Sequence, residues 1–381
     1  MKIAILGYGV VASGAYEVLK RNGYSVKRIL DIKKHDELGD ILTSNYDDIL
    51  NDDEIGVVAE AIGGLEPSHT FVVKALKAGK HVVSSNKHLI CNYYEELHAL
   101  AKENGVTIRF TSSVGGGIPW LCNLKRSVRL DEISRVMGIM NGTTNFILDA
   151  MTTDRRDFDE VLKEAQALGY AEANPSADVD GLDTARKTAI SSSIAFNTII
   201  KEENVSIFSM RNVKKSDIEY IGSKFDRVVR YMGFGQRTKN SISVFVEPVL
   251  LPKTAPEATV CKNFNMITLF GESVGRLSFL GQGAGKYPTG NAMAQDICDI
   301  VNGDTALYYE PVASSVDNGA LKRRYYIRAS IDKIDAEIDV SDVIDNSKVV
   351  ITKPISVKRM HELAVQIYKK DPSAFFAGIE E

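Results

Sequence analysis

The chain has little of what marks several large classes of protein. Among its 381 residues are only four cysteines, and their spacing fits neither a metal site nor a disulfide framework. The six histidines contain no HxxxH pair, so the sequence offers no zinc site. The N-terminal apolar run is too short for a signal peptide, and no run approaches the roughly 18 residues of a membrane span. We therefore expect a cytoplasmic protein whose cysteines, Cys91, Cys122, Cys261 and Cys298, are reduced and buried.

A strong charge of either sign is also missing. The net charge is −4 and charged residues make up 25% of the chain. This balance gives neither a basic field for nucleic acid nor the acidic block of a disordered tail. The length predicts two to three domains at roughly 150 residues each. We expect a soluble globular protein that acts on a small molecule and binds neither nucleic acid nor membrane.

The N-terminus carries a glycine-rich turn between a short apolar strand and a helix. In a dinucleotide-binding turn the first glycine makes the bend, the second admits the pyrophosphate, and a third small residue permits close helix packing. Gly7, Gly9 and Ala12 take these places. The start of the helix, with Val10 and Val11, offers unpaired N–H groups to phosphates. The turn therefore predicts a nicotinamide dinucleotide site.

The next predicted strand ends at Asp31, near the expected spacing of roughly 20 residues for the acid that binds the adenosine ribose. The neighbouring Lys33 and Lys34 could instead accept a 2′-phosphate. An ordinary polar residue closing a strand would look the same. The choice between NAD and NADP stays open at this point, with NAD slightly favoured.

Strand and helix patterns alternate over residues 1–130, which predicts a Rossmann-type parallel sheet covered on both faces. Residues 131–284 change to an α+β pattern, with alternating strands at 266–270 and 275–280 around a short turn. We expect this part to be a catalytic and dimerisation domain. An apolar helix at about 285–303 is predicted to return to the first domain.

Ligands of open parallel sheets bind beyond the carboxyl ends of the strands. Two segments should therefore face the cofactor: one contains Ile62 and Gly63, and the other ends at Lys87. A solvated loop lysine would explain Lys87 equally well.

One acid-rich stretch, residues 168–187, ends on two basic residues. Asp183 and Lys187 are four apart, so on a helix they share a face. Exposed pairs of this kind are commonplace and contribute only about 0.3–0.5 kcal/mol. The pattern of the flanking residues, however, predicts a largely buried helix. A charged pair in a buried helix usually has a structural or functional role. Gly169 falls where the cap of the preceding helix belongs.

Several motifs together resemble homoserine dehydrogenase over about residues 1–305. These are the N-terminal glycine turn, the acid-rich stretch, SSNK at 84–87, VGGGIP at 114–119, GIMNGTTNFIL at 138–148 and GQGAG at 281–285. The resemblance implies reversible NAD(P)-dependent reduction of L-aspartate 4-semialdehyde to L-homoserine, in threonine and methionine biosynthesis, by a homodimer. It also adds Gly169 and Gly285 to the cofactor residues.

For the substrate, the resemblance implies three partners. Glu172 would bind the ammonium, although an exposed loop acid is the plain alternative. The N–H groups of the turn at Gly142 and Thr143 would hold the carboxylate, although the turn could be a simple helix cap. Tyr170 would complete the pocket.

For the chemistry, the resemblance makes Lys187 the acid/base. A positioned ammonium stabilises the negative charge that hydride transfer leaves on the aldehyde oxygen and then supplies the proton. Lys87 and Asp183 would support it, Asp178 would order the network, and Asp180 is expected to cap the helix that carries Lys187.

The sequence departs from the family pattern in two places. The family commonly has a glutamate at the position of Thr111, near a structural monovalent cation. Backbone carbonyls of Val114, Gly116 and Ile118 could still bind sodium or potassium. The tail, residues 320–381, lacks a clear βαββαβ pattern of the regulatory ACT type, so we expect at most a reduced ACT-like element and predict no threonine inhibition.

Three other functions share part of this pattern. A related dehydrogenase could act on another amino-acid aldehyde. Aspartate semialdehyde dehydrogenase needs a nucleophilic cysteine with a basic partner, and Cys122 has no histidine nearby in sequence. A cofactor-binding regulator would have lost a catalytic residue, whereas Lys87, Glu172, Asp183 and Lys187 are all present.

Overall fold

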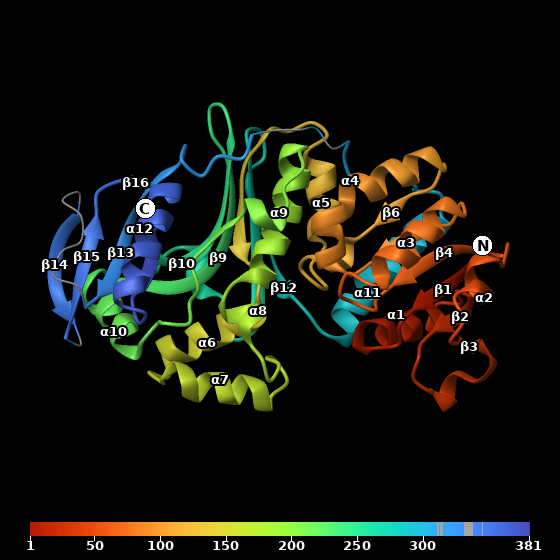
Figure 1. The fold of residues 1–381 in the computed structure, drawn as a ribbon, viewed down its shortest axis with the longest axis horizontal. Helices are drawn as coiled ribbons and strands as arrows, with labels where there is room; N and C mark the ends of the chain where they lie inside the picture. Colours follow the sequence, from red (N-terminus) through yellow and green to blue (C-terminus); the bar gives the residue numbers. More distant parts are fainter. Residues whose placement is uncertain (311, 313–314, 331–337, 345) are drawn as a thin grey trace. The chain divides into compact units, whose positions relative to one another are not determined.

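The structure is a computed structural model that describes residues 1–310, 312, 315–330, 338–344 and 346–381. The chain divides into two compact units, each made of several segments (Figure 1). Unit 1 comprises Met1–Arg129, Asn197–Ile199 and Gly281–Val312, and unit 2 comprises Leu130–Phe196, Ile200–Leu280 and Ala313–Glu381.

Unit 1 contains a six-stranded sheet in the order β3-β2-β1-β4-β5-β6, and every pair is parallel. This is the Rossmann order, in which a ligand crevice lies where the order reverses, here between β1 and β4. The predicted parallel sheet is confirmed. Its strands are β1 (Lys2–Leu6), β2 (Val26–Leu30), β3 (Leu42–Thr43), β4 (Ile55–Glu60), β5 (His81–Ser84) and β6 (Ile108–Arg109).

Helices cover both faces of this sheet. Successive residues of a strand point to opposite faces, and Ile3, Ala4, Ile5 and Leu6 of β1 are all fully buried. On one face, α1 (Val10–Arg21) and α11 (Lys286–Val301) pack together in one apolar cluster. Helix α11 spans most of the segment at about 285–303 and lies in unit 1. The other helices of unit 1 are α2 (Asp47–Leu50), α3 (Ser68–Lys77), α4 (Lys87–Glu103) and α5 (Trp120–Ser127).

The close contact of α1 with α11 depends on two glycines. A Cβ on Gly14 would lie 2.1 Å from the carbonyl oxygen of Lys286, and one on Gly290 would lie 2.6 Å from the backbone nitrogen of Ala15. No side chain fits in either place. The glycine turn therefore continues into a helix, α1, that needs small residues where it packs on α11 as well as in the turn at its N-terminus.

Unit 2 is built on an eleven-stranded mixed sheet with the path β12-β11-β7-β9-β10-β17-β13-β15-β14. The alternating segments predicted at 266–270 and 275–280 are neighbours in it, as β11 and β12. The predicted α+β class of the second part is confirmed. The strands before the tail are β7 (Ile133–Ile139), β8 (Ser206–Ile207), β9 (Arg227–Arg237), β10 (Ile242–Pro252), β11 (Phe264–Gly271) and β12 (Gly275–Gln282).

The tail extends the same sheet. Its last strand, β17 (Phe375–Ile379), pairs in parallel with β10 and antiparallel with β13 (Lys322–Ala329). The order β17-β13-β15-β14 has the fourth strand beside the first, as in a ferredoxin-like βαββαβ unit. The remaining elements are β14 (Ile338–Ile344), β15 (Ser347–Thr352), β16 (Ile355–Ser356) and α12 (Val357–Lys370).

Helix α9 (Leu182–Phe196), which carries Asp183 and Lys187, lies very close to β9. A Cβ on Gly233 or Gly235 of β9 would collide with the hydroxyls of Thr188 and Ser192. Almost every residue of α9 is buried as a result. The other helices of unit 2 before the tail are α6 (Gly142–Thr153), α7 (Phe158–Ala167), α8 (Ser176–Val179) and α10 (Lys215–Lys224).

Two further findings concern the expectations from composition. Within the described residues, no helix has the length and apolar character needed to cross a bilayer. All four cysteines are free thiols, but only Cys91 is buried, and Cys261 is exposed. The expectation of four buried cysteines was therefore wrong, because Cys261 lies in a loop at the surface rather than on an apolar face.

Gly14→Ala should destabilise the protein by at least about 1–3 kcal/mol, because the new methyl group forces α1 and α11 apart. Thermal unfolding followed by circular dichroism measures the loss. Gly222→Ala is the control, since this glycine lies within α10 with open space around it and should be neutral or slightly stabilising. Equal melting temperatures of wild type and Gly14→Ala would contradict the proposed packing constraint.

Candidate active site

The glycine turn of unit 1 is closed on one side and open on the other. Gly7 has φ +85°, and a Cβ there would lie 3.1 Å from the carbonyl oxygen of Ala61. Around Gly9, by contrast, a Cβ would meet nothing within 4 Å. Val10, the first residue of α1, is 66% exposed, whereas Val11 packs partly on the core. The turn therefore leaves room for a diphosphate at the helix N-terminus.

Asp31 lies directly beside this turn. Its Oδ2 accepts the N–H of Tyr8 at 2.6 Å, and its Oδ1 accepts the N–H of Lys33 at 2.8 Å. Burial disfavours the charge, but these two N–H groups outweigh it and lower the pKa of Asp31. Carboxylate oxygens can each accept a second hydrogen bond, so Asp31 remains able to bind a hydroxyl.

Two residues that sequence reasoning missed hold the loops that follow β4 and β5. Glu60, fully buried at the end of β4, accepts the N–H groups of Ile62 and Gly63 through one carboxylate oxygen. Asn86 caps α4 by accepting the N–H of Leu89 at 3.1 Å, so α4 begins at Lys87. Ile62, Gly63 and Lys87 thus all follow the carboxyl ends of neighbouring parallel strands, while Gly285 precedes α11 with φ +129°.

In unit 2, Lys187 is buried and doubly bound. Its Nζ lies 2.8 Å from Asp183 Oδ2 and donates to the carbonyl oxygen of Met140 at 2.8 Å. Lys187 is 8% exposed and Asp183 is 7% exposed, so the pair is not a surface ion pair. Its charges interact through a less polar medium than water, and the geometry of the ammonium is correspondingly fixed.

Asn141 connects this pair to the turn at Gly142 and Thr143. Its amide donates to Asp178 Oδ1 at 2.6 Å and to Asp183 Oδ2 at 2.9 Å. Its own oxygen accepts the N–H of Thr144 at 2.8 Å and thereby caps α6. One side chain therefore sets the spacing of two carboxylates and a helix N-terminus. The asparagine lies within the motif at 138–148, but nothing in the sequence revealed this role.

The start of α6 is held from two sides. The hydroxyl of Thr143 donates to the carbonyl oxygen of Tyr170, and a Cβ on Gly142 would lie 2.7 Å from the carbonyl oxygen of Asn263. Glu172, in contrast, is exposed on the loop after α7. Gly169 ends α7 with φ +75°, as its predicted capping position requires.

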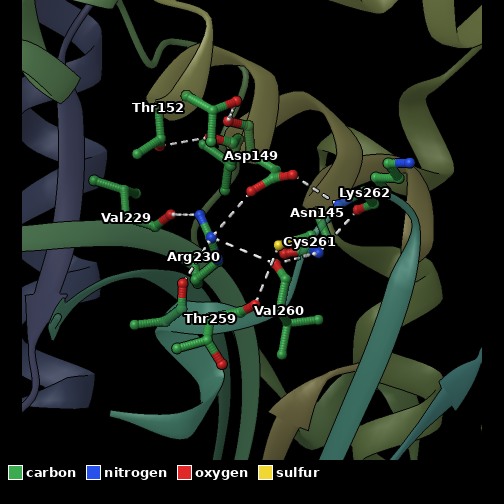
Figure 2. A network of polar contacts seen from close by, with 12 residues as sticks. Asn145, Asp149, Thr152, Val229, Arg230, Thr259, Val260, Cys261 and Lys262 are labelled. Carbon is green, nitrogen blue, oxygen red and sulfur yellow. Dashed lines mark hydrogen bonds and ion pairs between the residues drawn. The ribbon is translucent and has the colours of Figure 1, made fainter. Parts of the chain in front are cut away.

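A buried polar network fixes the far side of α6 (Figure 2). Asn145 donates to the carbonyl oxygens of Val260 and Lys262, and Arg230 lies 3.3 Å from Asp149. Burial lowers the pKa of Arg230, while Asp149 opposes that shift. These bonds join α6 to β9 and to the loop before β11, so the N-terminus of α6 cannot shift independently of the sheet.

One predicted role was wrong. Asp180 was expected to cap α9, but its carboxylate instead accepts hydrogen bonds from Ser209 Oγ at 2.9 Å and from Arg211 at 2.7 and 3.0 Å. The Arg211 guanidinium lowers the pKa of Asp180. A guanidinium with two parallel bonds competes better for a carboxylate than a single backbone N–H does.

Comparison with known proteins places these features in one family. The family model described as homoserine dehydrogenase, NAD binding domain, matches residues 7–111, and the model described as homoserine dehydrogenase matches residues 119–298. The homoserine dehydrogenase of Bacillus subtilis is 38% identical over 79% of this chain and 73% of its own length. The one from Pseudomonas aeruginosa is 34% identical over 86% of this chain and 81% of its own.

The chain belongs to the homoserine dehydrogenase family.

Solved structures agree. A homoserine dehydrogenase from Thiobacillus denitrificans matches with a TM-score of 0.89 and 30% identity, covering 100% of this chain and 98% of the other. The Staphylococcus aureus enzyme at pH 8.5 matches with a TM-score of 0.78 and 28% identity, covering 100% and 98%. The chain is therefore an NAD(P)-dependent oxidoreductase, and the family reaction interconverts L-aspartate 4-semialdehyde and L-homoserine.

The aspartate semialdehyde dehydrogenase alternative also fails on chemistry. A nucleophilic cysteine requires a lowered pKa or a basic partner. Burial instead raises the pKa of Cys122, whose Sγ donates to the carbonyl oxygen of Pro119 at 3.3 Å. This thiol is a structural group in α5.

The family glutamate missing at Thr111 has a counterpart elsewhere in unit 1. Asp296, on α11, accepts the N–H of Thr111 at 2.7 Å and its hydroxyl at 2.7 Å, and Tyr308 binds the same hydroxyl. A carboxylate therefore reaches position 111 from a different part of the sequence. Sequence analysis missed this replacement because nothing local connects residue 111 to residue 296.

Burial raises the pKa of Asp296 from 3.8 to about 6, against the opposing bonds from Thr111. A folded-state pKa above the unfolded value gives stability that is fully present below about pH 4 and is lost as the pH rises through about 6. Between these limits we expect wild type to lose up to about 3 kcal/mol more unfolding free energy than Asp296→Asn does. Fluorescence of Trp120, the one tryptophan, reports unfolding of unit 1. Parallel pH profiles would contradict the role of Asp296.

Proposed function

We propose that Lys187 is the acid/base of homoserine oxidation and semialdehyde reduction, aimed by Asp183. The observation that carries this assignment is the buried ammonium of Lys187, bound at 2.8 Å by both Asp183 and the Met140 carbonyl. An ammonium has three N–H donors, so two hold it in place and the third serves the substrate oxygen. A lysine held in this way needs little reorganisation when charge develops on that oxygen.

In the reduction, a bound NAD(P)H supplies the hydride to the aldehyde carbon of the substrate. The ammonium of Lys187 stabilises the resulting alkoxide and then donates its proton to it. In homoserine oxidation the neutral amine accepts that proton from the hydroxyl. Asp183 orients the lysine side chain through its ion pair, and Lys87 is assigned a supporting role in the chemistry.

The two ends of the amino acid are assigned to different groups. The N-terminus of α6, at Gly142 and Thr143, offers backbone N–H groups and a positive dipole end to the carboxylate. Glu172 is assigned the ammonium, Asp178 the ordering of the network through Asn141, and Tyr170 a wall of the site. The Tyr170 ring, which meets Phe146 edge-on at 5.3 Å, supports that last role.

Unit 1 is assigned the cofactor. Gly7, Gly9, Val10 and Val11 bind the diphosphate, and Asp31 binds the ribose hydroxyls. The remaining cofactor contacts are assigned to Ile62, Gly63, Lys87 and Gly285 of unit 1 and to Gly169 of unit 2. The Asp31 carboxylate, held charged beside the turn, favours NAD over the phosphate-bearing NADP.

Unit 2 is assigned substrate binding and dimerisation. The protein itself is assigned to the cytoplasm. Its β12 is an edge strand with exposed apolar residues nearby, including Val274 at 44% and Leu280 at 59% exposed. An edge strand of this kind presents unpaired backbone groups to a second copy. Edge pairing therefore supports a homodimer.

A monovalent cation is assigned to the carbonyls of Val114, Gly116 and Ile118 in unit 1. Gly115 and Gly116 have φ of +84° and +55°, so the backbone bends sharply where these carbonyls lie. Such neutral oxygens suit sodium or potassium. The cation would order the turn and takes no part in the chemical step.

Lys187→Met should lower kcat for homoserine oxidation by about 100-fold or more, because no neighbouring group replaces its proton transfer. Absorbance of the reduced nicotinamide follows the reaction with NAD and NADP, with and without potassium. Arg186→Met is the matched control, since Arg186 pairs with Glu202 instead and should keep kcat within a few-fold. Near-normal turnover of Lys187→Met, or no homoserine turnover by wild type, would defeat the assignment.

Asp31→Ala should raise the KM for NAD by about 10-fold or more, as expected for loss of a charged hydrogen bond to the ribose. The KM for NADP should change little or fall, because the carboxylate no longer repels the 2′-phosphate. Both constants come from initial rates at saturating homoserine. Equal losses for the two cofactors would show that another group binds the ribose.

A further inference from the structure

Several contacts join the tail to the rest of unit 2, among them the pairing of β17 with β10 and the bonds made by one short segment, residues 208–214, here called the connector. It runs from the end of β8 to the start of α10. A pocket of about 590 Å³ opens along one side of it, lined by residues that include Arg211, Asn212 and Ser373. The pocket leaves that side of the connector unpacked, so the buried side chains of Phe208, Met210 and Val213, together with the connector's hydrogen bonds, hold it in place.

The tail holds the connector through polar bonds. Asn212 donates to the carbonyl oxygens of Pro372 and Ala374 at 2.7 and 2.9 Å, and its own carbonyl accepts Arg328 at 2.8 Å. Arg328 is fully buried and pairs with Asp217 at 2.8 Å. Because Arg328 Nη1 also donates to the carbonyl oxygen of Ser373 at 3.2 Å, each nitrogen of this buried guanidinium has a partner, and this end of the connector is held firmly.

The connector in turn holds α8. Ser209 Oγ and the backbone N–H of Met210 both donate to the carbonyl oxygen of Val179 at 3.0 Å. Arg211 binds both oxygens of Asp180 and also donates to Ser176 Oγ at 3.1 Å. Hydrogen bonds from the connector thus hold the short helix α8 at its first residue, Ser176, at its last residue, Val179, and at its C-cap, Asp180.

Helix α8 carries Asp178, whose carboxylate accepts Asn141 at 2.6 Å. A four-residue helix has almost no stability of its own, so its position is set by what binds it. We propose that Arg211 is a positioning residue for the homoserine site. Through its bonds to Asp180, Arg211 fixes α8 and therefore the position of the Asp178 carboxylate. The tail in turn holds the connector that carries Arg211. This inference rests on the proposed function of that site.

The main test is Arg211→Met, which keeps the aliphatic stem and removes the two parallel bonds. The KM for homoserine should rise about 5-fold, while kcat and the KM for NAD stay within about 2-fold, because Lys187 and unit 1 are untouched. The same substitution in an Asp180→Asn background should have no further effect. Arg156→Met, which removes a comparable arginine pair with Glu160 and Glu164, is the control and should leave all constants unchanged.

A second readout does not need activity. Hydrogen exchange of the α8 amides should become faster in Arg211→Met and in Asn212→Ala, and not in Arg156→Met. An unchanged KM and unchanged exchange in Arg211→Met, or a KM that still rises in the Asp180→Asn background, would overturn the positioning role. If the wild-type protein does not turn over homoserine, the proposed function is refuted instead. The hydrogen-exchange measurement would still decide whether Arg211 positions α8.

Discussion

The amide of Asn141 is the interaction on which the substrate-binding side of the molecule depends. Two carboxylates in a largely buried site repel one another unless donors lie between them. Asn141 supplies those donors to Asp178 and Asp183, and Lys187 supplies the positive charge. Because the same residue caps α6, the position of the ammonium and the position of the helix N-terminus are set together. A single rigid amide thus coordinates the polar ends of the site.

Much of the architecture was predictable because its signals are local. The glycine turn at Gly7, the cap at Gly169 and the alternating segments of β11 and β12 each depend on residues a few positions apart. The pairing of β17 with β10 was not predictable, since strands distant in sequence carry no mark of their partner. The tail strands looked weak for the same reason: their burial comes from a sheet assembled elsewhere in the chain.

For the candidate site, sequence reasoning found the groups that carry charge and missed the groups that hold them. Lys187 and Asp183 were expected on one buried helical face, and the structure has them there. Asn141, Asp296 and Arg211 escaped notice because each acts on residues outside its own local segment. Asp180 was given the wrong role because a cap requires only a neighbouring N–H, whereas its true partner lies on the connector.

The return of α11 to unit 1 has a consequence for synthesis. The chain leaves unit 1 after Arg129 and, apart from the three residues Asn197–Ile199, re-enters it only at Gly281. As the protein emerges from the ribosome, the apolar face of α1 and its strands therefore waits uncovered until most of unit 2 has been made. Such a nascent intermediate exposes an apolar surface of the kind that chaperones bind. An excised N-terminal fragment would expose the same apolar surface permanently and would be prone to aggregate.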